Sequence, residues 1–427
     1  MVVWIQNPFD SLPLEGSRKM RYWLMGEAFV RAGWRVVLWT SDFSHATKER
    51  RRLQATDFTD CRGFEIRFIP TRPYRRNVSF ARILSHRAYA KEWLKMAAVE
   101  GEGENPDLIV TSMPTISGAA AALTLGRRFG AKVAVDVMDA WPETFERLVP
   151  HLALWPLRRT ARRIYRDADF VTGVCARYRE LTGRSDYYLA YHGIEVGGRG
   201  AMGGRGAMGG RGAMGGRGAM GGRGATSRIG AVDIQPIQPI QPIQPIQPIQ
   251  PIQPIQPIQP IQPILPTSHL IYSGNLGRTY DLETLVAVVE ANPRLTLDVA
   301  GFGEFSSFCP RIRFHGFLSE TGLQALFASC DIGVVPMAPD SWVGVPYKFA
   351  DYSRAGLRIV SSLGGESSAL LEKYRCGATY RVGDAASLAA AIEAAAELPK
   401  GASRRLCEAE FDAARIYDAY VQRFSGQ

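Results

Sequence analysis

A glycine-rich turn joins a short apolar run to a predicted helix near residue 270. The run Leu270–Tyr272 is typical of a buried strand, and it continues into Ser273-Gly274-Asn275-Leu276-Gly277-Arg278. Leucine and valine at helical spacing begin after Asp281. Glycines at such a junction let backbone N–H groups approach phosphate oxygens, and the helix dipole adds attraction. The pattern predicts an anion site, but one such turn is not specific.

A second polar segment makes this interpretation more specific. The segment Val345-Pro346-Tyr347-Lys348-Phe349-Ala350-Asp351-Tyr352 places one lysine and one carboxylate at the start of a predicted helix, and a predicted strand follows at 358–361. Spaced glycines, a lysine and a carboxylate together could form a pocket for a nucleotide diphosphate. We therefore expect a nucleotide-binding site in the second half of the chain.

The size and composition limit the classes of protein to consider. A chain of 427 residues is long enough for two α/β domains, and 46% hydrophobic with 22% charged residues is ordinary for a globular protein. No apolar run reaches the roughly 18–20 residues of a membrane span. The first residues lack a charged leader and enter a strand, so we expect no signal peptide. Six cysteines without a CxxC pair suggest reduced thiols in a cytoplasmic protein.

The charge is unevenly distributed along the chain. Residues 1–195 carry 30 Lys+Arg and 22 Asp+Glu, residues 196–264 carry 6 and 1, and residues 265–427 carry 15 and 18. Basic residues cluster at 72–95 and at 158–166, and Trp155 and Leu157 precede the second cluster. Aromatic and basic residues together favour peripheral contact with an anionic membrane. A solvated arginine-rich helix explains the same cluster, and because no nucleic-acid motif accompanies it, we expect no nucleic-acid partner.

Two low-complexity repeats lie in the middle of the chain. Residues 197–226 repeat Gly-Gly-Arg-Gly-Ala-Met, and residues 234–263 repeat Ile-Gln-Pro. The first repeat predicts a flexible coil, and proline at every third residue predicts a polyproline II rod in the second. Both periods are too short for a solenoid. We interpret the repeats as an expansion tolerated in an exposed linker, with a binding arm as the alternative.

Predicted strands and helices alternate on both sides of these repeats. We expect strands at 2–6, 35–40, 64–69, 108–111, 132–137 and 170–173, with helices at 18–32, 80–99, 117–129 and 157–166. After the repeats, we expect strands at 270–273, 295–300, 312–315, 332–335, 358–361 and 378–381, with helices at 281–291, 319–328, 347–354 and 385–397. This alternation predicts two doubly wound parallel sheets in an α/β protein. A last helix at 403–424 is long enough to fold back across both domains.

The order of several motifs resembles one known family, the GT-B glycosyltransferases of family 4, particularly bacterial enzymes of cell-surface polysaccharide and O-antigen synthesis. The first half contributes Asn7–Asp10, Glu15–Arg18 with Arg21, Thr40–His45, Asp139–Glu143 and His192–Glu195. The second half contributes Gly274–Gly277, Ala300–Glu304, Phe314–Gly316, and Pro346–Lys348 with Asp351–Tyr352. The resemblance covers nearly everything outside residues 196–267.

The resemblance implies two Rossmann-like domains that face a cleft, with the low-complexity insertion in the linker between them. Residues 1–195 would form the acceptor domain, residues 196–267 the repeat-bearing linker and residues 268–427 the donor domain. The implied donor-binding residues are Gly274, Asn275, Gly277, Gly303, Gly344, Val345, Tyr347 and Asp351. The implied acceptor and phosphate loop consists of Gly16, Ser17, Arg18, Arg21 and His45.

The implied catalytic groups are Arg278, Lys348 and Asp139. Arg278 and Lys348 would supply positive charge as the diphosphate leaves, which is the main electrostatic task of this chemistry. In family members a glutamate at the place of Asp351 accepts hydrogen bonds from ribose hydroxyls. Simpler interpretations remain open: Ser17 as a helix N-cap, Asp351 as an exposed helix carboxylate and His45 as a turn residue.

The sequence departs from the family pattern at the sugar. Many relatives have a first glutamate eight positions before the second, and here that position is Val343. Backbone near Gly344 and Val345, or Asp340, could replace it. Many relatives have a histidine where this chain has Met138-Asp139, so Asp139 is a candidate polar group there. Arg358 replaces a frequent proline.

We therefore expect a glycosyltransferase of the hexosyltransferase class. It would move a sugar from a UDP- or GDP-sugar to a lipid-linked or growing glycan acceptor with retention of configuration. The histidines show no metal-ligand spacing and no Asp-x-Asp is present, so we expect neither a metal nor another cofactor. The enzyme would be cytoplasmic, and the basic cluster with Trp155 favours a peripheral position at the inner face of the plasma membrane. The alternatives are a GT-B nucleotide-sugar epimerase and a degenerate GT-B protein that acts through its repeat arm.

Overall fold

The chain divides into two units. The computed structural model describes residues 1–51, 59–60, 63–76, 79–100, 105–146, 149–196, 267–277, 279–338 and 341–425. One unit comprises Met1–Gly197 with Leu265–Gln427, and the other is Gly198–Ile264. Both repeats lie outside the described residues, so the expectations for their structure remain predictions. Every element below belongs to the first unit.

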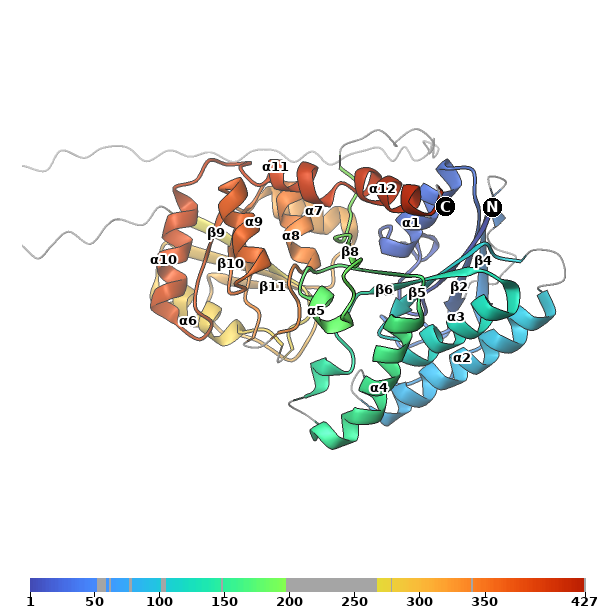
Figure 1. The fold of residues 1–427 in the computed structure, drawn as a ribbon. Helices are drawn as coiled ribbons and strands as arrows, with labels where there is room; N and C mark the ends of the chain where they lie inside the picture. The colour runs from blue at the N-terminus through green and yellow to red at the C-terminus, as the bar shows by residue number, and fades with distance from the viewer. Residues whose placement is uncertain are drawn as a thin grey trace, which may run out of the picture. The chain divides into compact units, whose positions relative to one another are not determined.

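The first half of this unit is built around an eight-stranded sheet (Figure 1). Its strand order is β3-β4-β2-β1-β5-β6-β7-β8, and every pairing is parallel except that of β3 with β4. The strands are β1 (Val2–Gln6), β2 (Arg35–Ser41), β3 (Thr59–Asp60), β4 (Phe64–Ile69), β5 (Leu108–Met113), β6 (Lys132–Val137), β7 (Phe170–Gly173) and β8 (Tyr188–Leu189). β1 and β5 pair in the register Val3↔Leu108.

Helices pack on both faces of this sheet because its strands are apolar on both sides. In β1, Trp4 joins one core with helices α2 and α3, whereas Val3 and Ile5 join the other with helix α1. The helices are α1 (Arg21–Arg31), α2 (Phe80–Glu100), α3 (Ile116–Phe129), α4 (His151–Asp167) and α5 (Tyr178–Thr182), with 3-10 turns η1 (Pro13–Glu15) and η3 (Glu143–Phe145). Two-sided burial is typical of parallel sheets.

The second half contains a parallel six-stranded sheet in the order β11-β10-β9-β12-β13-β14. Its strands are β9 (Ser268–Ser273), β10 (Leu295–Ala300), β11 (Ile312–Gly316), β12 (Ile332–Val335), β13 (Arg358–Ser361) and β14 (Gly377–Thr379). Its helices are α6 (Leu282–Ala291), α7 (Glu320–Ala328), α8 (Tyr347–Ala355), α9 (Glu366–Tyr374) and α10 (Ala385–Ala396). The predicted α/β class with two doubly wound Rossmann-like domains is confirmed. None of the helices in the described part of the chain combines the length and hydrophobicity needed to cross a bilayer.

The C-terminal segment corrects one prediction. Instead of one helix over 403–424, the chain forms α11 (Arg404–Leu406), a π-helical turn η4 (Cys407–Phe411) and α12 (Ala413–Ser425). Ile194, two residues before the predicted linker, causes the break, because its N–H donates to Phe411 O at 2.8 Å and its carbonyl accepts from Ala413 N at 2.9 Å. Helix α12 nevertheless returns to the first sheet and packs against α1 (Figure 1).

Several other elements differ from the sequence prediction, among them three helices. Helix α4 begins at His151, six residues before the predicted start, and Pro156 lies within it. Helix α1 begins at Arg21 rather than at residue 18. Helix α9 was not predicted at all, because it follows Gly364-Gly365 without a polar cap residue.

A buried ion pair ties α1 to the centre of the first sheet. Arg21 and Asp136 are both fully buried, with Nε and Nη2 of Arg21 at 2.7 and 2.8 Å from the two carboxylate oxygens. The hydroxyl groups of Tyr22 and Thr172 also donate to Asp136, each at 2.8 Å. Burial alone would raise the pKa of Asp136, but Arg21 and these hydrogen bonds hold it below its ordinary value of 3.8.

The same arginine holds the segment that leads into the linker. Its Nη1 donates to the carbonyl oxygens of Ala190 and Tyr191, both at 2.9 Å. The guanidinium also lies 5.6 Å from the ring centroid of Tyr417 in α12. One side chain thus connects α1, the first sheet, the linker and the C-terminal helix.

We predict that Asp136→Asn destabilises the protein by about 3–5 kcal/mol, because it leaves the Arg21 charge buried without a partner. Urea unfolding of both proteins measures the difference. Asp418→Asn is the control, because Asp418 pairs with Arg31 at the surface, where such changes usually stay within about 0.5 kcal/mol.

The pH dependence provides a second readout. Because folding lowers the pKa of Asp136, its contribution is complete above the unfolded value and is lost as pH falls through the lower folded value. The Asn variant should therefore lose less stability than wild type on acidification below about pH 4. Equal stability of both proteins at pH 7 would contradict this account.

Candidate functional site

Two glycine loops interlock at the carboxyl edge of the second sheet. Gly274, directly after β9, has φ +139°, and its N–H donates to Ala300 O at 2.8 Å. A Cβ atom on Gly301 would lie only 1.7 Å from Gly274 O, so no side chain fits between the loops. Within the described residues, the N–H groups of Asn275 and Gly277 have no hydrogen-bond acceptor. These donors are available to an anion.

Lys348 places a positive charge beside this turn. It lies in the first turn of α8 and is 7% exposed. Its Nζ is 4.2 Å from the ring centroid of Tyr280 and 5.1 Å from that of Tyr272. A Cβ on Gly274 would lie 2.8 Å from Nζ. Among the described residues this ammonium has no hydrogen-bond acceptor or carboxylate partner, which is costly for a buried charge unless an anion binds there.

A pocket of about 800 Å³ opens at the same edge of the sheet. Asn275, Gly277 and Gly303, three of the predicted donor-binding residues, line it together with Asp281 and Glu304. Asp281 is also the N-cap of α6, where its carboxylate accepts from Thr284 N at 3.2 Å. An anion would therefore meet the glycine turn rather than the end of the helix.

Asp351 and Arg18 meet although they come from different halves. Asp351 Oδ1 accepts a hydrogen bond from Arg18 Nη1, and no other described group occupies its second oxygen. Asp351 is 6% exposed, so the alternative of an exposed helix carboxylate does not fit. The guanidinium of Arg18 also lies 4.5 Å from the ring centroid of Tyr347. The structure thus brings three predicted site residues together.

Tyr347 also stacks on His192, with ring centroids 4.3 Å apart. His192 belongs to the linker motif, and sequence analysis assigned it no site role. Burial and nearby Arg21 lower its pKa to about 3, so the imidazole is neutral. Among the residues that the structure describes, the buried atoms Tyr347 Oη and His192 Nδ1 both lack a hydrogen-bond partner. Two such atoms side by side indicate a place for a polar ligand.

The loop around Gly344 lies against the first half. A Cβ on Gly344 would be 2.1 Å from Cys175 Sγ and 3.0 Å from Glu366 Oε2. Glu366 accepts from the Tyr191 hydroxyl at 2.5 Å and from Ala176 N at 2.8 Å. A carboxylate from α9 therefore lies next to this loop, which has no glutamate of its own at position 343.

Sequence analysis missed Glu366. A Gly-Gly-Glu sequence after β13 was the available signal for it. Val345, which was assigned to donor binding, is a core residue that is only 4% exposed.

Two predictions for the first loop need correction. Arg21 is fully buried against Asp136, so its guanidinium faces the interior and cannot reach a ligand. Ser17 is not a helix cap, because α1 has Met20 as its N-cap residue. Gly16 ends the turn η1 with φ +75° and has open space beside it.

Asp139 lies after β6, near a group of aromatic and basic side chains. It is accessible to solvent, yet the surrounding protein raises its pKa, an effect that Arg82 partly offsets. These two observations fit a carboxylate at the floor of a crevice. Arg82 lies 4.6 Å from the ring centroid of Trp141 and donates to His86 Nε2 at 3.4 Å. Asp139 is therefore accessible at the carboxyl end of β6, and its predicted role remains a prediction.

His45 lies in the same region, after β2. Its Nδ1 atom contacts the Tyr74 hydroxyl, and its ring meets Phe9 edge-on at 5.3 Å. Burial, followed by the charges of Arg82 and Lys48, lowers its pKa to about 3. His45 therefore remains neutral and is held by protein groups. Nearby Asp10, which sequence analysis did not single out, has its pKa raised to about 6 by burial.

Two predicted or alternative site residues cannot be placed. Arg278, a predicted catalytic residue, lies outside the described residues, as does Asp340. Their predicted roles remain predictions.

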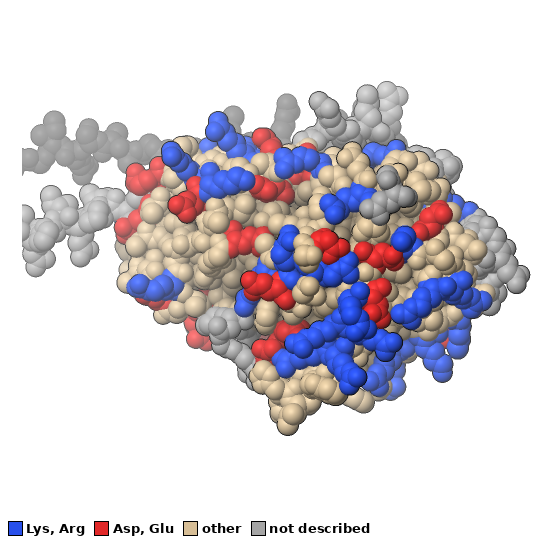
Figure 2. All heavy atoms as spheres, in the orientation of Figure 1, with Lys and Arg blue, Asp and Glu red and all other residues tan. Residues whose placement is uncertain are grey.

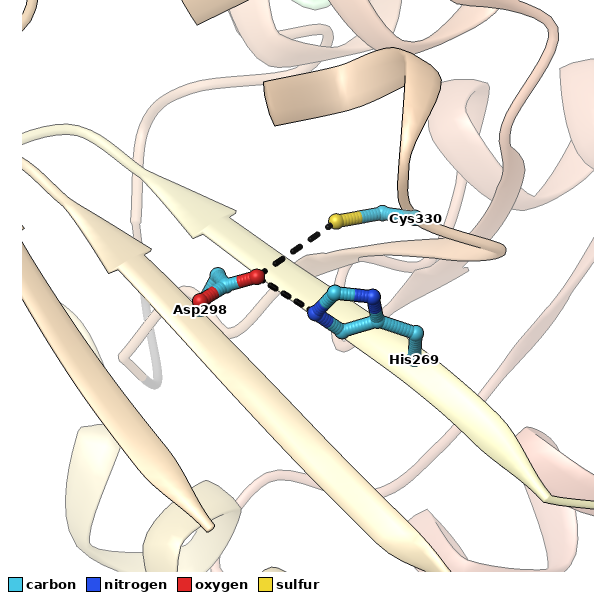
Figure 3. A group of neighbouring side chains, drawn as sticks. All are labelled: His269, Asp298 and Cys330. Carbon is cyan, nitrogen blue, oxygen red and sulfur yellow. Dashed lines mark hydrogen bonds and ion pairs between the residues drawn. The ribbon is translucent and has the colours of Figure 1, made fainter. Parts of the chain in front are cut away.

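One cluster has the residue types of a metal site. His269 on β9, Asp298 on β10 and Cys330 after α7 point toward one another (Figure 3). However, Arg313 donates to both Asp298 oxygens, at 2.8 and 3.0 Å. Burial raises the pKa of Cys330 to about 12, so it remains a thiol rather than the thiolate that metals bind. We interpret the cluster as a structural ion-pair network.

Two family models match the chain. Residues 21–188 match a glycosyl transferase 4-like domain, and residues 267–397 match glycosyl transferases group 1. No curated protein gives a match to this sequence.

The fold is similar to those of several solved structures. Sucrose-phosphate synthase from Thermosynechococcus elongatus has 14% identity, coverage of 100% of both chains and a TM-score of 0.64. Anabaena HepE, solved with UDP and glucose, has 11% identity, coverage of 100% of both chains and a TM-score of 0.58. A glycosyltransferase from Rickettsia africae has 10% identity, coverage of 99% of this chain and 97% of that one, and a TM-score of 0.52.

At these identities the structural likeness establishes the fold, and the two family models identify the class of enzyme. The chain combines a glycosyl transferase 4-like domain with a glycosyl transferases group 1 domain, and it is a glycosyltransferase with the GT-B fold.

Proposed function

We propose that this enzyme transfers a hexosyl group from a UDP- or GDP-sugar to a lipid-linked or growing glycan acceptor, with retention of configuration and without a metal. The family 4 enzymes of cell-surface polysaccharide synthesis, including the O-antigen type, are the model for this proposal. The reaction would take place at the cytoplasmic face of the membrane.

The observation that carries the proposal is the unpartnered ammonium of Lys348 beside an open glycine turn. A diphosphate there would accept hydrogen bonds from Asn275 N and Gly277 N and would neutralise the lysine charge. The free oxygen of Asp351 would accept hydrogen bonds from ribose hydroxyls. HepE was solved with UDP and with UDP-glucose, so a UDP-sugar is the first donor to test.

The same groups could account for catalysis. Departure of the sugar places negative charge on the diphosphate, and Lys348 with the backbone amides would stabilise that charge at a fixed position. Arg278 could add a second cation from the same turn. On the other side, Asp139 and the neutral His192 would contact the acceptor and the sugar. No protein nucleophile is required, because positioning and leaving-group stabilisation supply the rate enhancement.

We predict that the preferred nucleotide sugar raises the unfolding temperature of the wild-type protein. A ligand that binds only the folded state at 100 times its Kd adds about 2.7 kcal/mol of stability. A thermal-shift series with UDP-, GDP-, ADP- and dTDP-sugars measures it. The absence of a shift with all four would contradict the assigned site.

Lys348→Met should lower kcat by about 10²–10³ while the fold persists, because it removes charge stabilisation of the leaving group. Asp351→Asn should instead raise KM for the donor about 10- to 100-fold, the effect of losing a charged hydrogen bond worth about 1.5–3 kcal/mol. Steady-state kinetics with the donor found in the thermal-shift series measures both effects.

Lys373→Met is the matched control, because Lys373 is exposed in the same half and pairs with Glu410. Wild-type kinetics in both site variants would refute these roles. A product that stays linked to its nucleotide when no acceptor is present would identify an epimerase instead.

The second candidate is a catalytically degenerate protein that acts only through its repeat arm. It is considered because Val343 replaces a sugar-binding glutamate of the family, and loss of that glutamate would weaken catalysis. We expect a variant whose residues 198–264 are replaced by a flexible Gly/Ser linker to keep wild-type kcat within about twofold, since no assigned site residue lies there. A variant that folds, shows the donor-induced thermal shift and yet has no activity would favour the second candidate.

A further inference from the structure

An apolar cavity of about 480 Å³ lies in the first half, between α2, α3, η3 and α4. This volume is within the roughly 300–1,000 Å³ range of ligand pockets. Its walls are mainly hydrophobic, with the large apolar side chains Phe80, Ile83, Trp141, Phe145, Leu154 and Leu157, and they also include His86 and Arg87. Such a cavity accommodates a hydrocarbon chain far better than a sugar.

The inner end of the cavity lies where an acceptor would bind. Pro114 and Ile116 follow β5, and Trp141 follows β6, so these lining residues mark the carboxyl edge of the first sheet. Ligands of open α/β sheets bind at this edge. Asp139 is two residues before Trp141. A chain in the cavity would therefore place its polar end near the acceptor side of the site.

Exposed apolar side chains lie on the two helices α2 and α4 that line the cavity. Leu152 is 89% exposed, Phe80 69% and Trp155 57%. Leu152 and Trp155 belong to the first turns of α4, and Phe80 begins α2. Large apolar side chains grouped at a protein surface mark an interaction site.

Arginines continue along α4 from these apolar side chains. Arg159, Arg162, Arg163 and Arg166 are exposed at helical spacing, and Asp167 pairs with the last two. Figure 2 shows these basic residues gathered above an uncharged tip of the molecule. The guanidinium of Arg159 lies 5.4 Å from the ring centroid of Trp155. Basic residues beside exposed Trp and Leu match the chemistry of an anionic bilayer surface.

We propose that this cavity binds the hydrocarbon chain of an anionic lipid-linked acceptor while the α4 arginines contact phosphate headgroups of the bilayer. The inference rests on the proposed function and adds the place where the lipid enters. A nucleic acid would use the arginines but would leave the cavity empty.

The first experiment tests the cavity. Decyl phosphate, a single anionic chain, is titrated calorimetrically against wild type and Ala120→Trp, with decanol and inorganic phosphate as comparisons. Ala120 is partly exposed and lines the cavity, so tryptophan would fill it. Ala414→Trp, at an exposed position on α12, is the matched control. We expect Ala120→Trp to weaken decyl phosphate binding at least tenfold, whereas the control binds as wild type does.

The second experiment tests the surface by co-sedimentation with vesicles. Wild type should bind phosphatidylglycerol-containing vesicles and not pure phosphatidylcholine. Arg159→Glu/Arg162→Glu should lose at least tenfold in affinity. The control Arg405→Glu/Arg415→Glu makes the same charge change at other exposed positions, and it should keep the vesicle affinity of wild type.

The outcomes separate this inference from the proposed function. The donor-induced thermal shift should be the same in wild type, Ala120→Trp and the arginine variants, which also shows that they fold. The inference would be overturned if wild type and Ala120→Trp bound decyl phosphate equally, or if inorganic phosphate alone bound. It would also be overturned if wild type bound phosphatidylglycerol-containing and pure phosphatidylcholine vesicles equally. The proposed function would stand if the thermal shift persisted.

Discussion

The buried pair of Arg21 and Asp136 is the interaction on which the geometry of the site depends. Asp136 is in the central part of the first sheet, and Arg21 uses its remaining donors on the carbonyls of Ala190 and Tyr191. It thereby fixes both the start of α1 and the segment that leads to His192. A buried charge requires such a complete set of partners, and each partner here is also a structural connection.

In the candidate site, by contrast, several buried polar groups have no hydrogen-bond partner among the described residues. The ammonium of Lys348 lies near the rings of Tyr272 and Tyr280, and Tyr347 Oη and His192 Nδ1 have no hydrogen-bond partner in the described part of the chain. Other groups at this place are paired across the halves, as the Arg18–Asp351 ion pair illustrates. Part of the hydrogen-bonding capacity of the described residues is therefore unmet where the two halves meet. A nucleotide sugar would satisfy it, so substrate binding and closure of the halves would stabilise each other.

The features that could be predicted from the sequence are those that depend on short-range patterns. Strand β9, its glycine turn and the position of Lys348 all follow from short-range features, and the structure places them together. The role of Arg21 could not be predicted, because its partner Asp136 is 115 residues away and no local signal marks the pair. The break before α12 has the same kind of cause, since Ile194 reaches it from the segment before the linker.

Glu366 shows how the second half could compensate for Val343. Its carboxylate lies beside the Gly344 loop, but both oxygens are held by the first half, through the Tyr191 hydroxyl and Ala176 N. Separation of the halves would release both oxygens at once, and a sugar hydroxyl entering between the halves could then replace either partner. Arg21 donates a hydrogen bond to the carbonyl oxygen of Tyr191. The contact between the Tyr191 hydroxyl and Glu366 is therefore anchored to the buried pair of Arg21 and Asp136. Glu366 is therefore one of the groups that connect the second half to the first, because both of its carboxylate oxygens accept hydrogen bonds from the first half.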